Sequence, residues 1–184
     1  MNILVISGSR NPNGRTASAA DALLAGAAES GATGEQVFLP KLAIERCRQC
    51  DDNGWGICRS DGKCVIEDDF ASIVGKIESA DAVAFANPVY FGDLSESLRA
   101  FLDRLRRTCM HESGKARVAG KKAVGICVAG GGGGGGAPFC VFSMEKALSI
   151  CGFDVVDVIP ARRQNLDMKR EVLRLTGKWL AKGE

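Results

Sequence analysis

Residues 3–16 read ILVISGSRNPNGRT, and this stretch decides the fold class of the chain. An apolar run typical of a buried strand leads into a loop of glycine, hydroxyl and basic residues. An alanine-rich helical pattern starts at residue 15. Loops of this kind, placed before a helix N-terminus, bind phosphate groups through backbone N–H groups. The alternative is an ordinary surface turn after a strand.

The spacing of the glycines narrows the kind of phosphate that the loop would bind. It is not the loop of nucleotide hydrolases, because five residues separate Gly8 from Gly14 and Arg15 stands where the lysine would be. It is not the dinucleotide fingerprint either. The second strand, expected at 35–39, ends in Pro40-Lys41 with no acid to hold a ribose. The loop therefore suits a single terminal phosphate.

Length and composition indicate a globular protein. The 184 residues fit one domain, so we assign 1–184 to a single unit. A content of 46% apolar and 25% charged residues is typical of soluble proteins. The net charge of +2 gives no reason to propose a nucleic-acid partner. The nearest thing to a basic cluster is Arg104, Arg106 and Arg107, which we expect at the solvated end of a helix.

The sequence also indicates where the protein works. No apolar run approaches the roughly 20 residues of a membrane span, so we expect no membrane partner. We see no export signal, because the first strand begins at once. Eight cysteines without such a signal favour a reducing, cytoplasmic location. Four of these cysteines are dispersed (Cys109, Cys127, Cys140 and Cys151), and we expect them to be small buried residues.

Strand and helix patterns alternate along the chain. Strands are expected at 2–7, 35–39, 82–86, 123–129 and 153–159. Helices are expected at 15–30, from about 68–69, and at 94–107, 138–151 and about 167–181. A loop rich in cysteine, glycine and aspartate covers about 43–65. Apolar strands separated by helices predict an α/β, three-layer doubly wound domain with a parallel five-stranded sheet.

Ligands of such sheets bind beyond the carboxyl ends of the strands. Two further loops should therefore lie beside the first. Residues 87–93 read NPVYFGD and offer a proline, two aromatic rings and a glycine. Residues 130–136 are seven consecutive glycines, which can donate backbone N–H groups with no side chain in the way. The alternatives are a simple strand cap and a flexible linker, but a linker is unusual between a strand and its helix in a compact domain.

Together these motifs resemble the flavodoxin-like NAD(P)H-dependent FMN reductases, and within them the iron–sulfur flavoprotein and multimeric flavodoxin branch. The resemblance covers most of residues 1–160. It depends on the loop at 8–16, a C-x2-C pair with GKCVIEDD at 62–69, NPVYFG at 87–92, LRAFLDR at 98–104 and the glycine run. The family implies a flavodoxin-like fold with strand order 2-1-3-4-5.

The resemblance also implies a cofactor and the residues that bind it. The FMN phosphate would be surrounded by Ser9, Arg10, Asn13, Gly14, Arg15 and Thr16. The isoalloxazine would be contacted by Pro88, Val89, Tyr90, Phe91 and Gly92, and its pyrimidine side would face Gly131, Gly132 and Gly133. The flavin accepts hydride and carries the chemistry, so we name no catalytic acid or base. The single histidine, His111, is expected at the surface.

Four of the eight cysteines are close together. Cys47, Cys50, Cys58 and Cys64 give the spacing C-x2-C-x7-C-x5-C, which suits a [4Fe–4S] cluster or a tetrahedral zinc ion. The iron–sulfur flavoproteins have a tighter spacing, with the third cysteine closer to the second. Many relatives keep some of these cysteines and bind no cluster. A cluster, zinc and free thiols therefore remain the alternatives.

Three functions follow from these patterns. The leading one is a cytoplasmic oxidoreductase that takes electrons from NAD(P)H through FMN to a quinone, flavin, metal or protein acceptor, with the cluster as a relay. The second is an electron-transfer protein without enzyme activity, although classical flavodoxins are strongly acidic and this chain is not. The third is a zinc-stabilised binding module. Relatives with the flavin near a subunit boundary imply a homodimer or homotetramer.

Overall fold

The computed structural model describes residues 1–131 and 137–183. Its centre is a parallel sheet with the strand order β2-β1-β3-β4-β5. The strands are β1 (Asn2–Ser7), β2 (Thr33–Phe38), β3 (Ala82–Pro88), β4 (Lys122–Ala129) and β5 (Asp154–Arg162). Both the doubly wound architecture and the order 2-1-3-4-5 are therefore confirmed.

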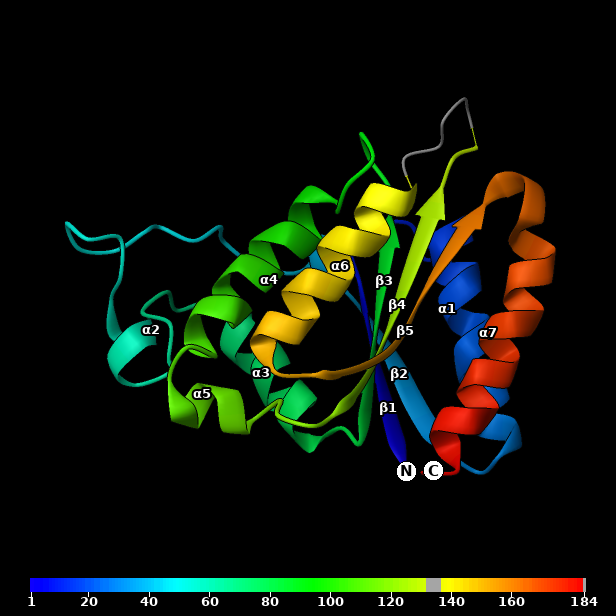
Figure 1. Cartoon of the computed structure of the whole chain (residues 1–184), viewed down its shortest axis with the longest axis horizontal. Coiled ribbons are helices and arrows are strands. Elements are labelled where there is room, and N and C mark those ends of the chain that lie inside the picture. Colours follow the sequence, from blue (N-terminus) through cyan, green and yellow to red (C-terminus); the bar gives the residue numbers. More distant parts are fainter. Residues whose placement is uncertain (132–136, 184) are drawn as a thin grey trace.

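Helices cover both faces of the sheet (Figure 1). One face carries α1 (Arg15–Glu29) and α7 (Leu166–Ala181), and the other carries α3 (Phe70–Ser79), α4 (Glu96–Thr108) and α6 (Ala137–Cys151). Two short helices, α2 (Ile57–Ser60) and α5 (Glu112–Ala116), and 3₁₀ turns at Leu39–Lys41 and Arg163–Asn165 complete the elements. In the described ranges 1–131 and 137–183, no helix has the length and hydropathy needed to cross a membrane.

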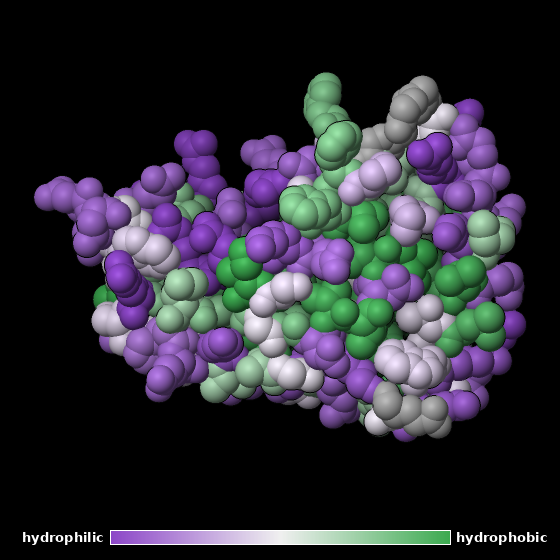
Figure 2. Space-filling model, viewed as in Figure 1, coloured by the Kyte–Doolittle hydropathy of each residue, from purple (hydrophilic) through white to green (hydrophobic). Residues whose placement is uncertain are grey.

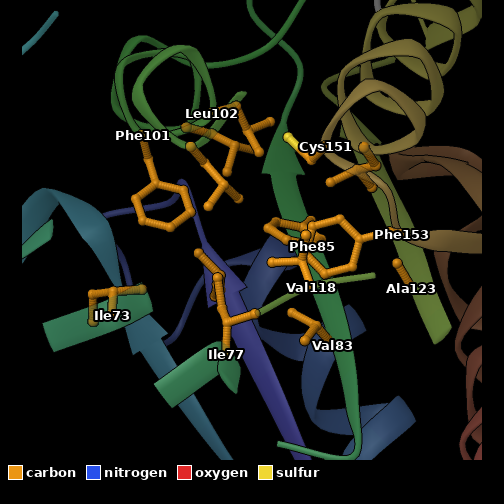
Figure 3. Packing of buried hydrophobic residues seen from close by; sticks show 14 of the residues in the cluster. Ile73, Ile77, Val83, Phe85, Phe101, Leu102, Val118, Ala123, Cys151 and Phe153 are labelled. Atoms are coloured by element: carbon orange, nitrogen blue, oxygen red, sulfur yellow. The ribbon is translucent and has the colours of Figure 1, made fainter. Parts of the chain in front are cut away.

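The two faces of the sheet are packed with different residues. On β3, Val83 and Phe85 face α3, α4 and α6, where the ring of Phe85 meets Phe153 edge to face at 5.5 Å (Figure 3). The other face of β3 presents three buried alanines, Ala82, Ala84 and Ala86, to α1. These small side chains let the alanine-rich α1 approach the sheet closely, which fixes where its N-terminus lies.

Several boundaries differ from the predicted ones. Asp68 and Asp69 precede α3 rather than lying in its first turn, and Asp68 accepts a hydrogen bond from the backbone N–H of Phe70 at 3.1 Å. The pattern gave no sign of α5, whose N-cap is His111 with its ring accepting from Ser113 N. The fifth strand runs three residues beyond its predicted end.

The expectation for Arg104 was wrong. Arg106 and Arg107 lie partly exposed at the end of α4, but the Arg104 side chain is only 1% exposed. Residues 98, 101, 102 and 105 of α4 form its buried face, and position 104 falls on that face too. Arg104 can be buried there because it pairs with the carboxylate of Asp68.

The segment at 43–65 leaves the sheet and extends beyond α3 and α4 (Figure 1). Its one described helix is α2, which lies against α4. The four dispersed cysteines are buried in the core, as expected. The assignment of residues 1–184 to one domain stays a prediction.

Helices α1 and α7 pack through two glycines. A Cβ atom at Gly177 would overlap the carbonyl oxygen of Leu23, and one at Gly26 would overlap the carbonyl of Arg174. The two backbones therefore touch directly at these points. Any side chain larger than hydrogen would push the helices apart.

We expect Gly177→Ala to lower the free energy of unfolding by about 1–3 kcal/mol through overpacking. Gly75→Ala is the matched control, because Gly75 lies exposed in α3 with open space around its Cβ position. That change should raise stability by up to about 1 kcal/mol through helix propensity. Urea unfolding of both variants measures the difference, and equal effects would contradict the packing argument.

Candidate functional site

A cleft opens at the carboxyl edge of the sheet, where the loops after β1, β3 and β4 meet. Its volume is about 660 Å³, within the range of roughly 300–1,000 Å³ for small-molecule sites. We call it the edge cleft. Its lining residues are Ser9, Asn11, Asn13, Gly14, Arg15, Thr16, Pro88, Val89, Tyr90, Val128, Ala129 and Gly130.

The edge cleft gathers most of the predicted flavin-site residues. The exceptions are Arg10, Phe91, Gly92 and Gly131, which do not line it. Gly132 and Gly133 lie outside the described residues. Asn11 and the end of β4 also line the cleft, although the sequence analysis did not single them out. Their position between a predicted loop and a predicted strand end was the available signal.

The loop after β1 is shaped by its own short side chains. The Ser7 hydroxyl accepts from Ser9 N at 3.2 Å, the Ser9 hydroxyl from Asn11 N at 3.3 Å, and the Asn11 side-chain oxygen from Asn13 N at 3.0 Å. These successive turns lead to Gly14, the N-cap of α1. No side chain caps this helix. Its first N–H groups therefore remain available to an anion in the cleft.

Gly8 is needed for close packing rather than for an unusual turn. A Cβ at this position would overlap the Ser95 hydroxyl at the start of α4. The backbone of Gly8 is held from both sides, because its N–H donates to Ala86 O at 2.8 Å and its carbonyl accepts from Ser97 Oγ at 3.1 Å. The loop is thereby anchored to β3 and to α4.

The turn after β3 presents two aromatic side chains. Tyr90 and Asp93 exchange backbone hydrogen bonds of 3.2 and 2.9 Å across Phe91 and Gly92, which both have positive φ (49° and 81°). A left-handed backbone at a phenylalanine costs about 1–2 kcal/mol, so the turn is strained. Phe91 is fully exposed at its tip. Arg99 anchors the turn through an ion pair with Asp93.

A second hollow is lined by all four clustered cysteines, and we call it the cysteine cavity. Cys47, Cys50, Cys58 and Cys64 line it together with other residues that include Arg104 and Arg107. The structure thus brings together side chains that lie as many as 17 positions apart in the sequence. Within the described residues, however, no three His, Cys, Asp or Glu side chains are arranged to hold a single metal ion.

A buried ion pair borders the cysteine cavity. Arg104 and Asp68 form it, with side-chain exposures of 1% and 5%. Burial alone would raise the pKa of Asp68, but hydrogen bonds from Arg104 and from backbone N–H groups lower it below its ordinary value. Burial would lower the pKa of Arg104, and hydrogen bonding to Asp68 outweighs this and raises it. Both groups are therefore charged at neutral pH.

A third hollow, the connecting groove, has a volume of about 1000 Å³. Tyr90 lines both this groove and the edge cleft. Cys47 lines both the groove and the cysteine cavity. The groove therefore borders the edge cleft at Tyr90 and the cysteine cavity at Cys47.

The remaining cysteines lie in the core. The sulfurs of Cys127 and Cys140 are 3.4 Å apart, and Asn87 Nδ2 lies 3.3 Å from Cys140 Sγ. The hydrogen bond with Cys140 and burial both raise the pKa of Cys127, which keeps it a neutral thiol. We assign these residues no role beyond packing.

An open parallel α/β sheet of this order, with an uncapped helix N-terminus beside a cleft at the carboxyl edge, defines the flavodoxin-like class of phosphate-binding folds. A solved archaeal flavodoxin shares the fold, with a TM-score of 0.60 at 16% identity over 100% of this chain and 98% of that one. The chain matches the NADPH-dependent FMN reductase family over residues 1–159 and belongs to it.

Two further proteins are similar to this chain. An iron–sulfur flavoprotein of Methanocaldococcus jannaschii is 34% identical over 125 residues, which are 68% of this chain and 62% of that protein. The chain thus matches less than two thirds of that relative's length. A solved NAD(P)H:quinone oxidoreductase from Methanothermobacter marburgensis has a TM-score of 0.71 at 19% identity, covering 98% of this chain and 96% of the other.

Proposed function

We propose that this chain is an FMN-dependent oxidoreductase that takes electrons from NAD(P)H and passes them to a quinone, flavin, metal or protein acceptor. Membership of a flavin-dependent NAD(P)H oxidoreductase family supports the reaction class. The observation that carries the proposal is the uncapped N-terminus of α1, which opens into a cleft of suitable size. A phosphate there would satisfy backbone N–H groups at a helix end that no described side chain caps.

The residues of the edge cleft fit FMN in three respects. Ser9 and Thr16 supply hydroxyls beside the helix N-terminus, at 9% and 5% exposure. Arg15 adds a positive charge to the phosphate end. Pro88, Val89 and Tyr90 line the same cleft and supply apolar surface for a ring system.

The protein's part in the reaction is to bind and orient. When bound, the flavin supplies hydride acceptance and onward electron transfer. The loop at 9–16 would hold the phosphate, and the strained turn at 90–93 holds Tyr90 at the cleft. Tyr90 is 59% exposed there, so its ring can be reached from solvent by a nicotinamide or an acceptor.

The test is a titration of flavin-free protein with FMN and FAD, followed by anaerobic addition of NADPH or NADH. We expect FMN to bind more tightly and to be reduced by a nicotinamide. Ser9→Ala combined with Thr16→Ala should weaken FMN binding at least about tenfold, because each lost contact to a charged phosphate costs roughly 1.5–3 kcal/mol. Thr33→Ala, at the opposite edge of the sheet, is the control and should leave the affinity unchanged.

Different failures of this test identify different alternatives. Recovery of FAD, or no flavin binding at all, would contradict the proposal. If dithionite reduces the bound FMN but NADPH and NADH do not, the result would indicate an electron-transfer protein without enzyme activity. An unchanged affinity in the double variant would mean that the phosphate lies elsewhere.

We further propose that Cys47, Cys50, Cys58 and Cys64 bind one [4Fe–4S] cluster that relays electrons from FMN. Four thiols around one cavity support this, as does the similarity to an iron–sulfur flavoprotein. Four thiolates are the usual ligand set of such a cluster. A zinc ion is the less favoured alternative, because within the described residues no three of these side chains converge on one point.

Replacing any one of the four cysteines with serine should remove most of the bound iron and leave FMN largely in place. Iron and sulfide analysis of anaerobically reconstituted protein, with its visible spectrum, measures this. Cys109→Ala is the control, since Cys109 is a buried cysteine that does not line the cavity. If wild-type protein contains neither iron nor zinc in stoichiometric amount, the four cysteines are free thiols and the cluster proposal is wrong.

We also propose that the protein is a homodimer or homotetramer. Three aromatic side chains, Phe91, Phe139 and Phe142, are 107%, 76% and 68% exposed. Hydrophobic residues gather on the face where α6 lies (Figure 2). Exposed apolar area of this kind is typical of a protein interface.

Light scattering at micromolar concentration should therefore give a dimeric or tetrameric mass. Phe142→Glu should shift the mass toward the monomer because it places a charge in the buried interface. Ala28→Glu, at an exposed position of α1 on the other face of the sheet, should not. A monomeric wild-type protein would refute the proposal.

A further inference from the structure

The segment that carries the four cysteines is closed at its base by one buried ion pair. Arg104 of α4 donates from Nη1 to Asp68 Oδ2 at 2.6 Å and from Nη2 to Asp68 Oδ1 at 2.9 Å. Two parallel hydrogen bonds between these charged groups fix the orientation of the guanidinium as well as its position. The face of the guanidinium lies 4.2 Å from the ring centre of Phe70, which fixes it further.

The same pair holds both ends of the segment. Arg104 Nη1 also donates to Glu45 O at 3.0 Å, and Nη2 donates to Ile66 O at 3.4 Å. Asp68 Oδ2 in turn accepts from Glu45 N at 2.8 Å. Cys47 and Cys64, the first and last of the four cysteines, each lie two residues inside these anchor points. The width of the loop at its base is therefore set by Arg104 and Asp68.

One donor of Arg104 has no partner. Its Nε atom is buried, and it is one of two buried side-chain nitrogen or oxygen atoms in the described residues without a hydrogen bond. A buried N–H without an acceptor is unfavourable. Arg104 also lines the cysteine cavity, with the thiol of Cys64 beside its guanidinium. An acceptor bound in that cavity within reach of Nε would satisfy the donor.

A cluster held by four thiolates provides such an acceptor. Its sulfur atoms are electron-rich, and hydrogen bonds to them and the local charge set its reduction potential. A buried guanidinium favours the more negatively charged, reduced form, and so raises the potential. No other residue that lines the cavity combines full burial, a positive charge and a free donor; Arg107, which also lines it, is only part-buried and donates to Gly54 O.

We propose that Arg104 is a positioning residue of the four-cysteine site. With Asp68 it closes the base of the segment, and it donates its Nε–H to a cysteine sulfur when the cluster is bound. This inference depends on the proposed cluster. It assigns control of the cluster's retention and reduction potential to a residue outside the cysteine motif. Arg104 does not line the edge cleft, so FMN binding does not depend on it directly.

The experiment uses the full chain, reconstituted anaerobically with iron and sulfide and loaded with FMN. Arg104→Lys retains the charge and loses both the planar pair with Asp68 and the Nε donor. We expect it to keep FMN, to lose iron to a chelator at least threefold faster than wild type, and to have a lower cluster reduction potential. Arg106→Lys, a partly exposed arginine of the same helix, is the matched control and should change none of these.

Asp68→Asn separates the two parts of the role. It weakens the base of the segment, leaves the Arg104 donor in place and removes the negative charge of the carboxylate, so iron loss should become faster while the potential rises instead of falling. Loss of the whole cluster from Arg104→Lys with FMN retained would also support the proposal. If Arg104→Lys loses both FMN and the cluster, the result for Asp68→Asn decides. Iron loss from Asp68→Asn at the wild-type rate then overturns the proposal.

The failures are distinguishable. An Arg104→Lys protein with the wild-type rate of iron loss and the wild-type potential overturns this inference and leaves the cluster proposal intact. Faster iron loss at an unchanged potential overturns the hydrogen bond to sulfur and reduces Arg104 to a structural role. Wild-type protein that takes up no cluster overturns both proposals together.

Discussion

The arrangement of the site depends on one buried amide, that of Asn87 at the end of β3. Its Oδ1 accepts from Ser95 N at 2.8 Å, which fixes the start of α4. Its Nδ2 donates to Pro88 O at 2.9 Å, which fixes the start of the aromatic turn, and lies 3.3 Å from Cys140 Sγ in α6. A fully buried amide with both ends bonded holds its neighbours in one geometry, because any displacement leaves a polar group unsatisfied. Three of the segments that surround the carboxyl edge thus meet at one side chain.

Much of this could be predicted from the sequence. A parallel sheet forces the loops after β1, β3 and β4 to one edge, so their residues converge whatever their detailed conformations. The apolar runs of the strands and the alanine content of α1 are local signals, and they placed the five strands and the longer helices in the right order along the chain but missed the short α2 and α5. The two ends of each element were less certain, because side-chain caps such as His111 and the acceptor Asp68 are decided by partners elsewhere in the chain.

Arg104 shows why the rest could not be predicted. Sequence analysis places an arginine among the apolar positions of a helix at the edge of the solvent-exposed face unless its ion-pair partner is known. The partner of Arg104, Asp68, lies 36 residues away in the sequence. The signal was present, since position 104 lies three residues after Phe101 and next to Leu105, both fully buried. The hydrophobic periodicity of a helix cannot identify the carboxylate whose ion pair offsets the free-energy cost of burying an arginine. Likewise, the spacing of the cysteines gives their number and separation, and it does not show that one cavity receives all four.

The row of three hollows links these observations. The edge cleft and the cysteine cavity belong to different parts of the fold, one held by the sheet edge and Asn87, the other by Arg104 and Asp68. Between them lies the connecting groove, bordered by Tyr90 at one end and Cys47 at the other. A groove of about 1000 Å³ leaves a single copy of the chain with open space between its two proposed redox centres. A second copy, or an acceptor seated in the groove, would fill that space, so the assembly of the protein and its path of electron transfer are one structural question.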